Sequence, residues 1–178
     1  MKTVSQIVSL AALIATLLAS GAGLAQEKHK YYFKAPPGVT KYTQQQTIDV
    51  GDVPGHQIRI AQLHSKYTDP APSYDGVKVR EAMGYLSSDY VNGSGRFTQY
   101  GVAQMENGDR LFQRSEALAQ TSVAADGSRK ASFATVTTLA GGTGKFAAIR
   151  GVLRSTGFTD FKTGTSDTVT EGEYWFEK

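Results

Sequence analysis

The chain has 178 residues, of which 40% are hydrophobic and 20% charged, with a formal net charge of +3 and no cysteine. The lack of cysteine excludes disulfides, thiolate metal sites and cysteine nucleophiles. Basic and acidic side chains are interspersed without a basic block, so nucleic acid is not an expected partner.

The first 25 residues have the pattern of a secretory signal peptide. Lys2 supplies the positive charge, residues 7–18 form an apolar run, and small residues precede Ala25. We therefore expect cleavage near Ala25 and a secreted or periplasmic protein, with no stable membrane insertion after cleavage. The apolar run is interrupted by Ser9 and Thr16 and is shorter than the roughly 20 residues a membrane span needs, so an uncleaved anchor is the weaker alternative.

The rest of the chain divides into an irregular leader, residues 26–43, and a single domain, residues 44–178. Pro36 and Pro37 argue against a helix in the leader. The domain is a series of alternating segments with turn residues between most of them, which predicts antiparallel strands. The expected strands are residues 45–50, 57–65, 77–87, 95–106, 109–121, 130–139, 151–161 and 168–177. Asn107-Gly108 is the strongest hairpin signal, because both residues tolerate positive φ, and Asp126-Gly127 is the next.

Eight strands joined by short links predict an all-β fold, an eight-stranded antiparallel β-barrel of lipocalin-like shape with little helix. The one expected helical turn covers residues 144–149. Closure removes exposed edges, and a barrel of this size holds packed side chains or one small ligand. A sandwich of two sheets is the alternative.

A glycine-rich segment, Gly141-Gly142-Thr143-Gly144-Lys145-Phe146, continues through Ala147-Ala148-Ile149-Arg150-Gly151. It lacks the spacing of a phosphate-binding loop, and no long helix is expected after it. The segment instead resembles the Gly-Gly-Thr-Gly-x-Phe-x-x-Ala-Arg-Gly motif of the allene oxide cyclase and dirigent protein superfamily. Asn92-Gly93-Ser94-Gly95-Arg96-Phe97 is similar to the glycine-rich strand entry of that superfamily, as are Gly101 and Asn107-Gly108-Asp109 to the pattern of its bacterial members.

The resemblance covers roughly residues 89–176 and implies an eight-stranded barrel with an internal pocket. It also implies that Arg150 lies at the pocket, as in the dirigent branch, and that a homo-oligomer is compatible with the fold, since the plant branches commonly form trimers. Ile149 stands where the family usually has alanine. The acidic catalytic residues of the plant members do not map onto this sequence by motif.

Strand alternation gives candidate site residues. Glu81 shares its parity with Val77, Val79, Met83 and Tyr85, which predicts a carboxylate on the apolar inner face. There, desolvation would raise its pKa unless a cation is near, and it would serve as an acid, a base or a ligand contact. The alternative is that a bulge shifts the parity, or that a buried arginine pairs with Glu81.

Phe112, Arg114 and Glu116 share one face of the fifth expected strand. Arg114 and Glu116 form either a surface ion pair, the favoured interpretation, or a pair inside the barrel that binds a polar group. The candidate ligand-binding residues are Arg114, Tyr85, Tyr100 and Phe112; the candidate catalytic residues are Glu81, Glu116 and Arg150. His56 and His64 lie eight residues apart, about 26 Å along a strand, so no metal site or cofactor is expected.

The leading hypothesis is an exported barrel that binds a small hydrophobic or phenolic molecule in its interior. One alternative is an isomerase, a cyclase or a stereochemistry-directing protein of the allene oxide cyclase and dirigent type, acting without metal or covalent nucleophile. The other is a structural or surface-interaction protein with a filled core.

Overall fold

The computed structural model describes residues 26–160 and 165–178; the expected signal peptide lies outside the described residues. Ten strands and one short 3-10 turn make up the described chain. They are β1 (His29–Ala35), β2 (Thr40–Asp49), β3 (His56–Lys66), β4 (Ser73–Tyr74), β5 (Val77–Val91), β6 (Ser94–Met105), β7 (Arg110–Val123), β8 (Arg129–Gly142), η1 (Gly144–Phe146), β9 (Ile149–Asp160) and β10 (Thr165–Phe176). No helix in these described ranges has the length and apolar character needed to cross a membrane.

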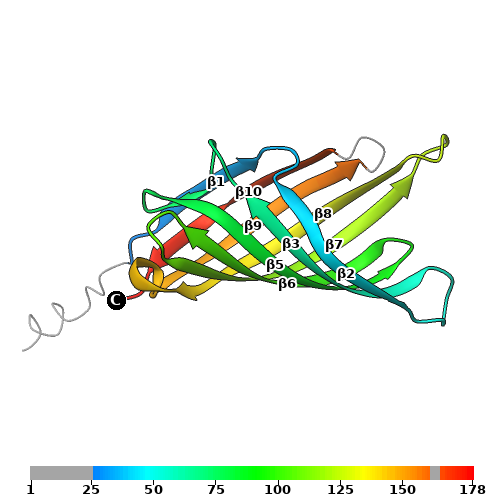
Figure 1. The fold of residues 1–178 in the computed structure, drawn as a ribbon, viewed down its shortest axis with the longest axis horizontal. Coiled ribbons are helices and arrows are strands. Elements are labelled where there is room, and N and C mark those ends of the chain that lie inside the picture. Colours follow the sequence, from blue (N-terminus) through cyan, green and yellow to red (C-terminus); the bar gives the residue numbers. More distant parts are fainter. Residues whose placement is uncertain (1–25, 161–164) are drawn as a thin grey trace, which may run out of the picture.

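The strands form one antiparallel sheet in the order β1-β10-β9-β8-β7-β6-β5-β3-β2, and β4 pairs with β5 off this path. The all-β prediction and the near absence of helix are thus confirmed, and a single continuous sheet replaces the two-sheet alternative. The sheet curls into a barrel-like shape, as the ribbon shows (Figure 1). The prediction of eight strands in a closed barrel is wrong, because the sheet has ten strands and its edges β1 and β2 are not hydrogen-bonded to each other.

The expected leader supplies β1, one of the two additional strands, and β4 is the other. Residues 29–35 of the leader form β1, which pairs along its whole length with β10, from His29 opposite Tyr174 to Ala35 opposite Thr168. Each neighbouring pair along the sheet is antiparallel, so the edge strands β1 and β2 run in the same direction, joined by residues 36–39. No helix forms at Pro36 and Pro37, as expected, and the two prolines lie in the link between β1 and β2.

The eight expected strand segments all overlap observed strands. Asn92 and Gly93 alone join β5 to β6, with positive φ angles of 52° and 81°, and Asp75 and Gly76 join β4 to β5 in the same way, at 47° and 79°. This is the backbone of a two-residue primed turn. At the expected Asn107-Gly108 turn only Gly108 has a positive φ, and four residues connect the strands. The expected turn at 144–149 is present as η1, three residues long.

The hydrophobic core lies at the end of the sheet that carries η1, which we call the η1 end. Phe146, Met105, Leu111, Leu139 and Ile149 are its largest fully buried side chains. The opposite end carries the β2–β3, β5–β6 and β7–β8 turns, and we call it the hairpin end (Figure 1). The face of the sheet that carries the core is its inner face.

Candidate functional site

Sheet register identifies which side chains share the inner face. One row of directly paired positions runs from Arg59 on β3 through Ser88, Phe97, Ala117 and on to Thr135, Ser155 and Thr170. Ser88 and Ala117 are buried, while the neighbouring strand positions Ile60 and Leu118 are 63% and 58% exposed. Alternation therefore places this row inside and its neighbours outside.

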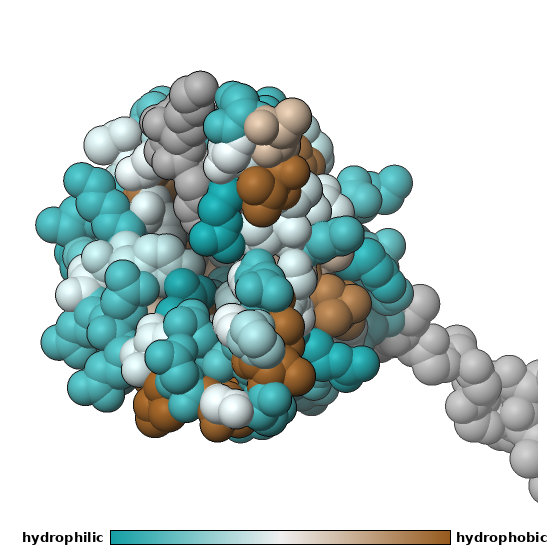
Figure 2. Space-filling view, turned by 90° about the vertical axis from the view of Figure 1, so that its right-hand side faces the viewer, coloured by the Kyte–Doolittle hydropathy of each residue, from teal (hydrophilic) through white to brown (hydrophobic). Residues whose placement is uncertain are grey.

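The inner face changes character along the strands. At the η1 end it carries large side chains that are almost fully buried. Toward the hairpin end many of its residues are small or carry hydroxyls, and several of these are partly exposed, including Thr135, Ser155, Gly157 and Thr170. Solvent therefore reaches the inner face in this half, which we call the open half. Figure 2 views the hairpin end, where hydrophilic residues dominate the surface.

Hydroxyl pairs line the inner face between directly opposed positions. Ser115 and Thr137 are 2.8 Å apart on β7 and β8, and Ser155 and Thr170 are 2.9 Å apart on β9 and β10. The two hydroxyls of each pair hydrogen-bond to each other across adjacent strands, so they are polar but carry no net charge. These pairs consequently add neutral polar groups to an inner face that also carries aromatic side chains.

Two aromatic residues in this half, Phe133 and Tyr90, lie against the neighbouring strand. A Cβ placed on Gly157 would fall 2.5 Å from the ring of Phe133, its inward neighbour on β8, and one on Gly95 would fall 3.1 Å from the ring of Tyr90. Each ring thus covers a glycine on the next strand. This close approach keeps aromatic surface on the wall instead of across the interior.

Arg59 is a cation on the inner face of the open half. Its guanidinium carbon lies 5.2 Å from the centre of the Tyr42 ring and 5.6 Å from that of Tyr90. These are cation–π distances, and each contact contributes about 0.5–1 kcal/mol when partly exposed. Burial raises the pKa of Tyr90, and the positive charge of Arg59 partly offsets that rise. No carboxylate among the described residues forms an ion pair with Arg59.

Two polar atoms of this site are buried without a hydrogen-bond partner among the described residues: Nε of Arg59 and Oγ of Ser88. Ser88 is only 2% exposed, and it is directly opposite Arg59 in the β3–β5 register. A buried polar atom without a partner costs about 1–3 kcal/mol. Two such atoms on directly paired residues indicate a site where water or a bound molecule supplies the missing hydrogen bonds.

The expected site residues Glu81 and Tyr85 lie on the outer face. A register shift between Val79 and Glu81 puts one extra residue into β5 opposite β6, so the two residues no longer share a face. Val79 is buried at 3% exposed, whereas Tyr85 is 48% exposed. The alternative of a parity-shifting bulge is thus the observed one, and the expectation of Glu81 on the inner face is wrong.

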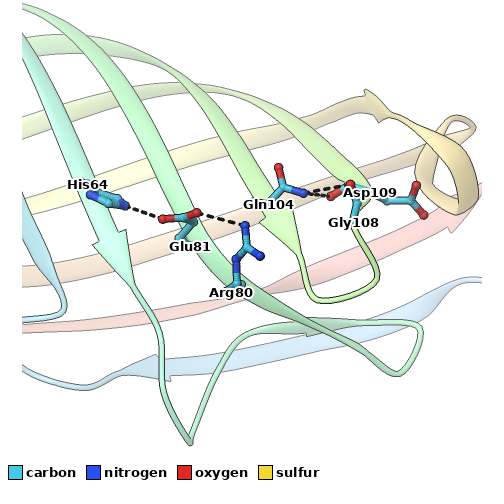
Figure 3. A network of polar contacts seen from close by, with 6 residues as sticks. All are labelled: His64, Arg80, Glu81, Gln104, Gly108 and Asp109. Carbon is cyan, nitrogen blue, oxygen red and sulfur yellow. Dashed lines mark hydrogen bonds and ion pairs between the residues drawn. The ribbon is translucent and has the colours of Figure 1, made fainter.

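Glu81 belongs to a polar network on that outer face (Figure 3). Its carboxylate is 2.9 Å from Nε2 of His64 and 3.3 Å from an Nη of Arg80. The hydrogen bond to His64 is the main cause that lowers the pKa of Glu81, which is the opposite of the rise expected in an apolar interior. Gln104, also drawn in Figure 3, instead donates to the backbone carbonyls of Gly108 and Asp109.

The other expected residues share the outer face. Arg114 and Glu116 are exposed there, as the surface interpretation expects, but these two residues form no ion pair with each other. Tyr100, directly opposite both Tyr85 and Arg114, is 40% exposed. Phe112 has the same parity as Arg114 and is partly buried. The register therefore brings Tyr85, Tyr100 and Arg114 into one row, but on the outside.

Arg150 lies at the start of β9, at the η1 end. It donates to the backbone oxygen of Ile149 at 2.8 Å and forms an ion pair with Glu177 at 2.9 Å. These contacts tie the glycine-rich segment to the C-terminal residues, away from the open half. The described residues also hold no cluster of three metal-ligating side chains.

A separate groove of about 630 Å³ lies on the outer face of β1, β10 and β9, between Tyr32, Arg154, Glu171 and Trp175. Lys28 fills part of its rim, in an ion pair with Glu173 and 5.7 Å from the centre of the Trp175 ring. Two of the charged groups at the groove, Lys28 and Glu173, therefore already pair with each other.

Sequence reasoning missed Arg59, Ser88 and Tyr42. On β3 the apolar residues Ile58 and Ile60 alternate with Arg59, which favours an inner position for the isoleucines. The structure has the reverse, with Ile60 63% exposed. The available signal was the parity of the small residues Ala61 and Ser65, which are both buried.

Comparison with known proteins gave one structural likeness. A solved structure of the pterocarpan synthase dirigent protein PsPTS1 aligns with 86% of this chain and 96% of its own, at 16% sequence identity and a TM-score of 0.44. No family model matches the sequence, and no curated protein matches it.

Proposed function

We propose that this chain is an exported binding protein that holds a small apolar or phenolic molecule in the open half of its curled sheet. The observation that carries the proposal is the contrast along the inner face. The η1 end is packed with fully buried side chains, while the open half is lined by small, hydroxyl-bearing and wall-lying aromatic residues that solvent reaches. A concave, mostly apolar surface with a few placed polar groups is the usual form of a small-molecule site.

Binding is favoured over catalysis by the placement of the candidate acids. Glu81 and Glu116 are on the outer face, and Arg150 is committed to Glu177 and a backbone carbonyl. An isomerase or stereochemistry-directing role, the alternative implied by the sequence motif, would have to rely on the shape of the interior and on Arg59 and the tyrosines.

The test fills the open half and compares the result with a matched change outside. Thr135 is on the inner face of β8, and its neighbour Ala134 is exposed on the outer face. Native mass spectrometry of the protein purified from its own host should show an excess mass released on denaturation. We expect Thr135→Phe to lose that mass and Ala134→Phe to keep it, with both variants folded by circular dichroism.

Retention of the bound mass by folded Thr135→Phe would contradict binding in the open half. A clean mass for the wild-type protein would favour the third hypothesis, a barrel that acts through its outer surface. The same spectra test export, because cleavage near Ala25 gives a mature chain that begins at Gln26.

A further inference from the structure

We infer that the molecule bound in the open half carries a carboxylate, and that Arg59 and Ser88 hold it. This inference rests on the proposed function and specifies its ligand class. It depends on the two unpartnered polar atoms, Nε of Arg59 and Oγ of Ser88, which belong to directly paired residues of β3 and β5.

The chemistry of the two groups selects an anion. The guanidinium has only donors, and Arg59 has no ion-pair partner among the described residues, so its charge is uncompensated in a partly buried place. The Nε edge of a guanidinium, with its neighbouring Nη, binds a carboxylate by donating two parallel hydrogen bonds to its oxygens. The hydroxyl of Ser88 can donate a third.

The surroundings fix the orientation of Arg59 and suit the rest of the ligand. Cation–π contacts with Tyr42 and Tyr90 hold the guanidinium plane near two strands. Phe97 is directly opposite Ser88 on β6 and faces the interior, followed by Ala117 on β7. A carboxylate at Arg59 would therefore have its apolar body next to Phe97 and above the small residues of the row.

The test uses two probes of nearly equal shape, 2-naphthoate and 2-naphthamide, with affinity measured by calorimetry on the mature protein. We expect naphthoate to bind at least tenfold more tightly. Arg59→Gln should abolish this preference, and Ser88→Ala should reduce it several-fold. Arg96→Gln, which removes an exposed cation from the outer face of β6, should leave the preference unchanged.

Arg59→Lys is a second variant, for the case in which Arg59→Gln does not fold. It keeps the charge but loses the Nε edge, so an intermediate preference is expected. Equal affinity of both probes, each lost in Thr135→Phe, would overturn the carboxylate inference while the binding function stands. Failure of both probes to bind the wild-type protein at millimolar concentration would count against both proposals. A naphthoate preference that survives in folded Arg59→Gln would place the anion elsewhere and overturn the assignment to Arg59.

Discussion

At the scale of single residues, His56 at the hairpin end contacts two carboxylates, one through each ring nitrogen. Its Nδ1 is 2.6 Å from a carboxylate oxygen of Asp52, and its Nε2 is 2.8 Å from one of Asp89. Asp52 belongs to the β2–β3 turn and Asp89 to β5, so one imidazole joins the turn to the neighbouring strand. Both ring nitrogens donate only when the imidazole is protonated.

These contacts make the stability of the protein depend on pH. The hydrogen bond to Asp89, followed by that to Asp52, raises the pKa of His56 above its usual 6.5. A raised folded-state pKa gives stabilisation that is complete below the unfolded value and disappears as pH rises through the folded value. The bond to His56 also lowers the pKa of Asp52, and that contribution is lost only in acid, as pH falls through the lowered value.

We therefore predict that His56→Gln destabilises the protein more at pH 5.5 than at pH 8.5, measured by urea unfolding at both values. The His56 titration followed by NMR should have its midpoint above 6.5, and Asp89→Asn should lower that midpoint. An equal effect of His56→Gln at the two pH values would show that the imidazole is not held in its charged form.

At the scale of elements, the bulge in β5 decides which residues form the site. Before it, Val79 faces the core; after it, Ala82, Gly84, Leu86 and Ser88 do, and Glu81 is outside. One extra residue in a strand exchanges the two faces for everything that follows. The position of Ser88 opposite Arg59 in the interior depends on this shift.

A paired substitution tests the position of the bulge. Val79→Ala should lower the free energy of unfolding by about 2 kcal/mol, because the side chain is buried in the core. Glu81→Ala should lower it much less than Val79→Ala does, because partly exposed ion pairs contribute little. Both values follow from denaturant titration. A larger loss in Glu81→Ala than in Val79→Ala would place the carboxylate inside the sheet.

The same element shows what the sequence could predict. Alternation and turn residues located the strands well, because each strand buries one face and ends at a polar or glycine turn. They did not locate the faces, because a bulge leaves no distinctive residue behind: Val79-Arg80-Glu81 reads like regular alternation. On β3 the pattern was misleading, since Ile58 and Ile60 are on the outer face while Arg59 is inside. The strand β1 was missed because its pairing with β10 joins residues about 140 positions apart.

At the scale of the whole molecule, a cluster of tyrosines connects the first and last strands, β1 and β10, through β4. Tyr31 of β1 stacks on Tyr74 of β4 with ring centres 4.8 Å apart, and Tyr74 meets Tyr174 of β10 edge to face at 5.5 Å. The hydroxyl of Tyr174 accepts a hydrogen bond from the backbone of Asp75 at 2.8 Å. The cluster thus packs the edge strand β1 and the β4 segment over the core, where the sheet has no closing hydrogen bonds.

Because these tyrosines are buried, we predict the pH range in which the protein unfolds in alkali. Desolvation raises the pKa of Tyr31 to about 12 and that of Tyr74 well above its usual value of 10. Because these folded-state values exceed the unfolded one, the stabilisation is complete below pH 10 and is lost as pH rises from 10 toward 12.

We expect cooperative unfolding in that window, with absorbance at 295 nm rising in two phases, first from exposed tyrosines and then together with loss of the circular dichroism signal. The neighbours Tyr31 and Tyr32 provide a matched pair, since Tyr31 is 8% and Tyr32 68% exposed. Tyr31→Phe should reduce the late phase, whereas Tyr32→Phe, an exposed position, should leave the pH of unfolding unchanged. A reduced early phase in Tyr31→Phe would mean that Tyr31 ionises in the folded protein and that β1 does not cover the core.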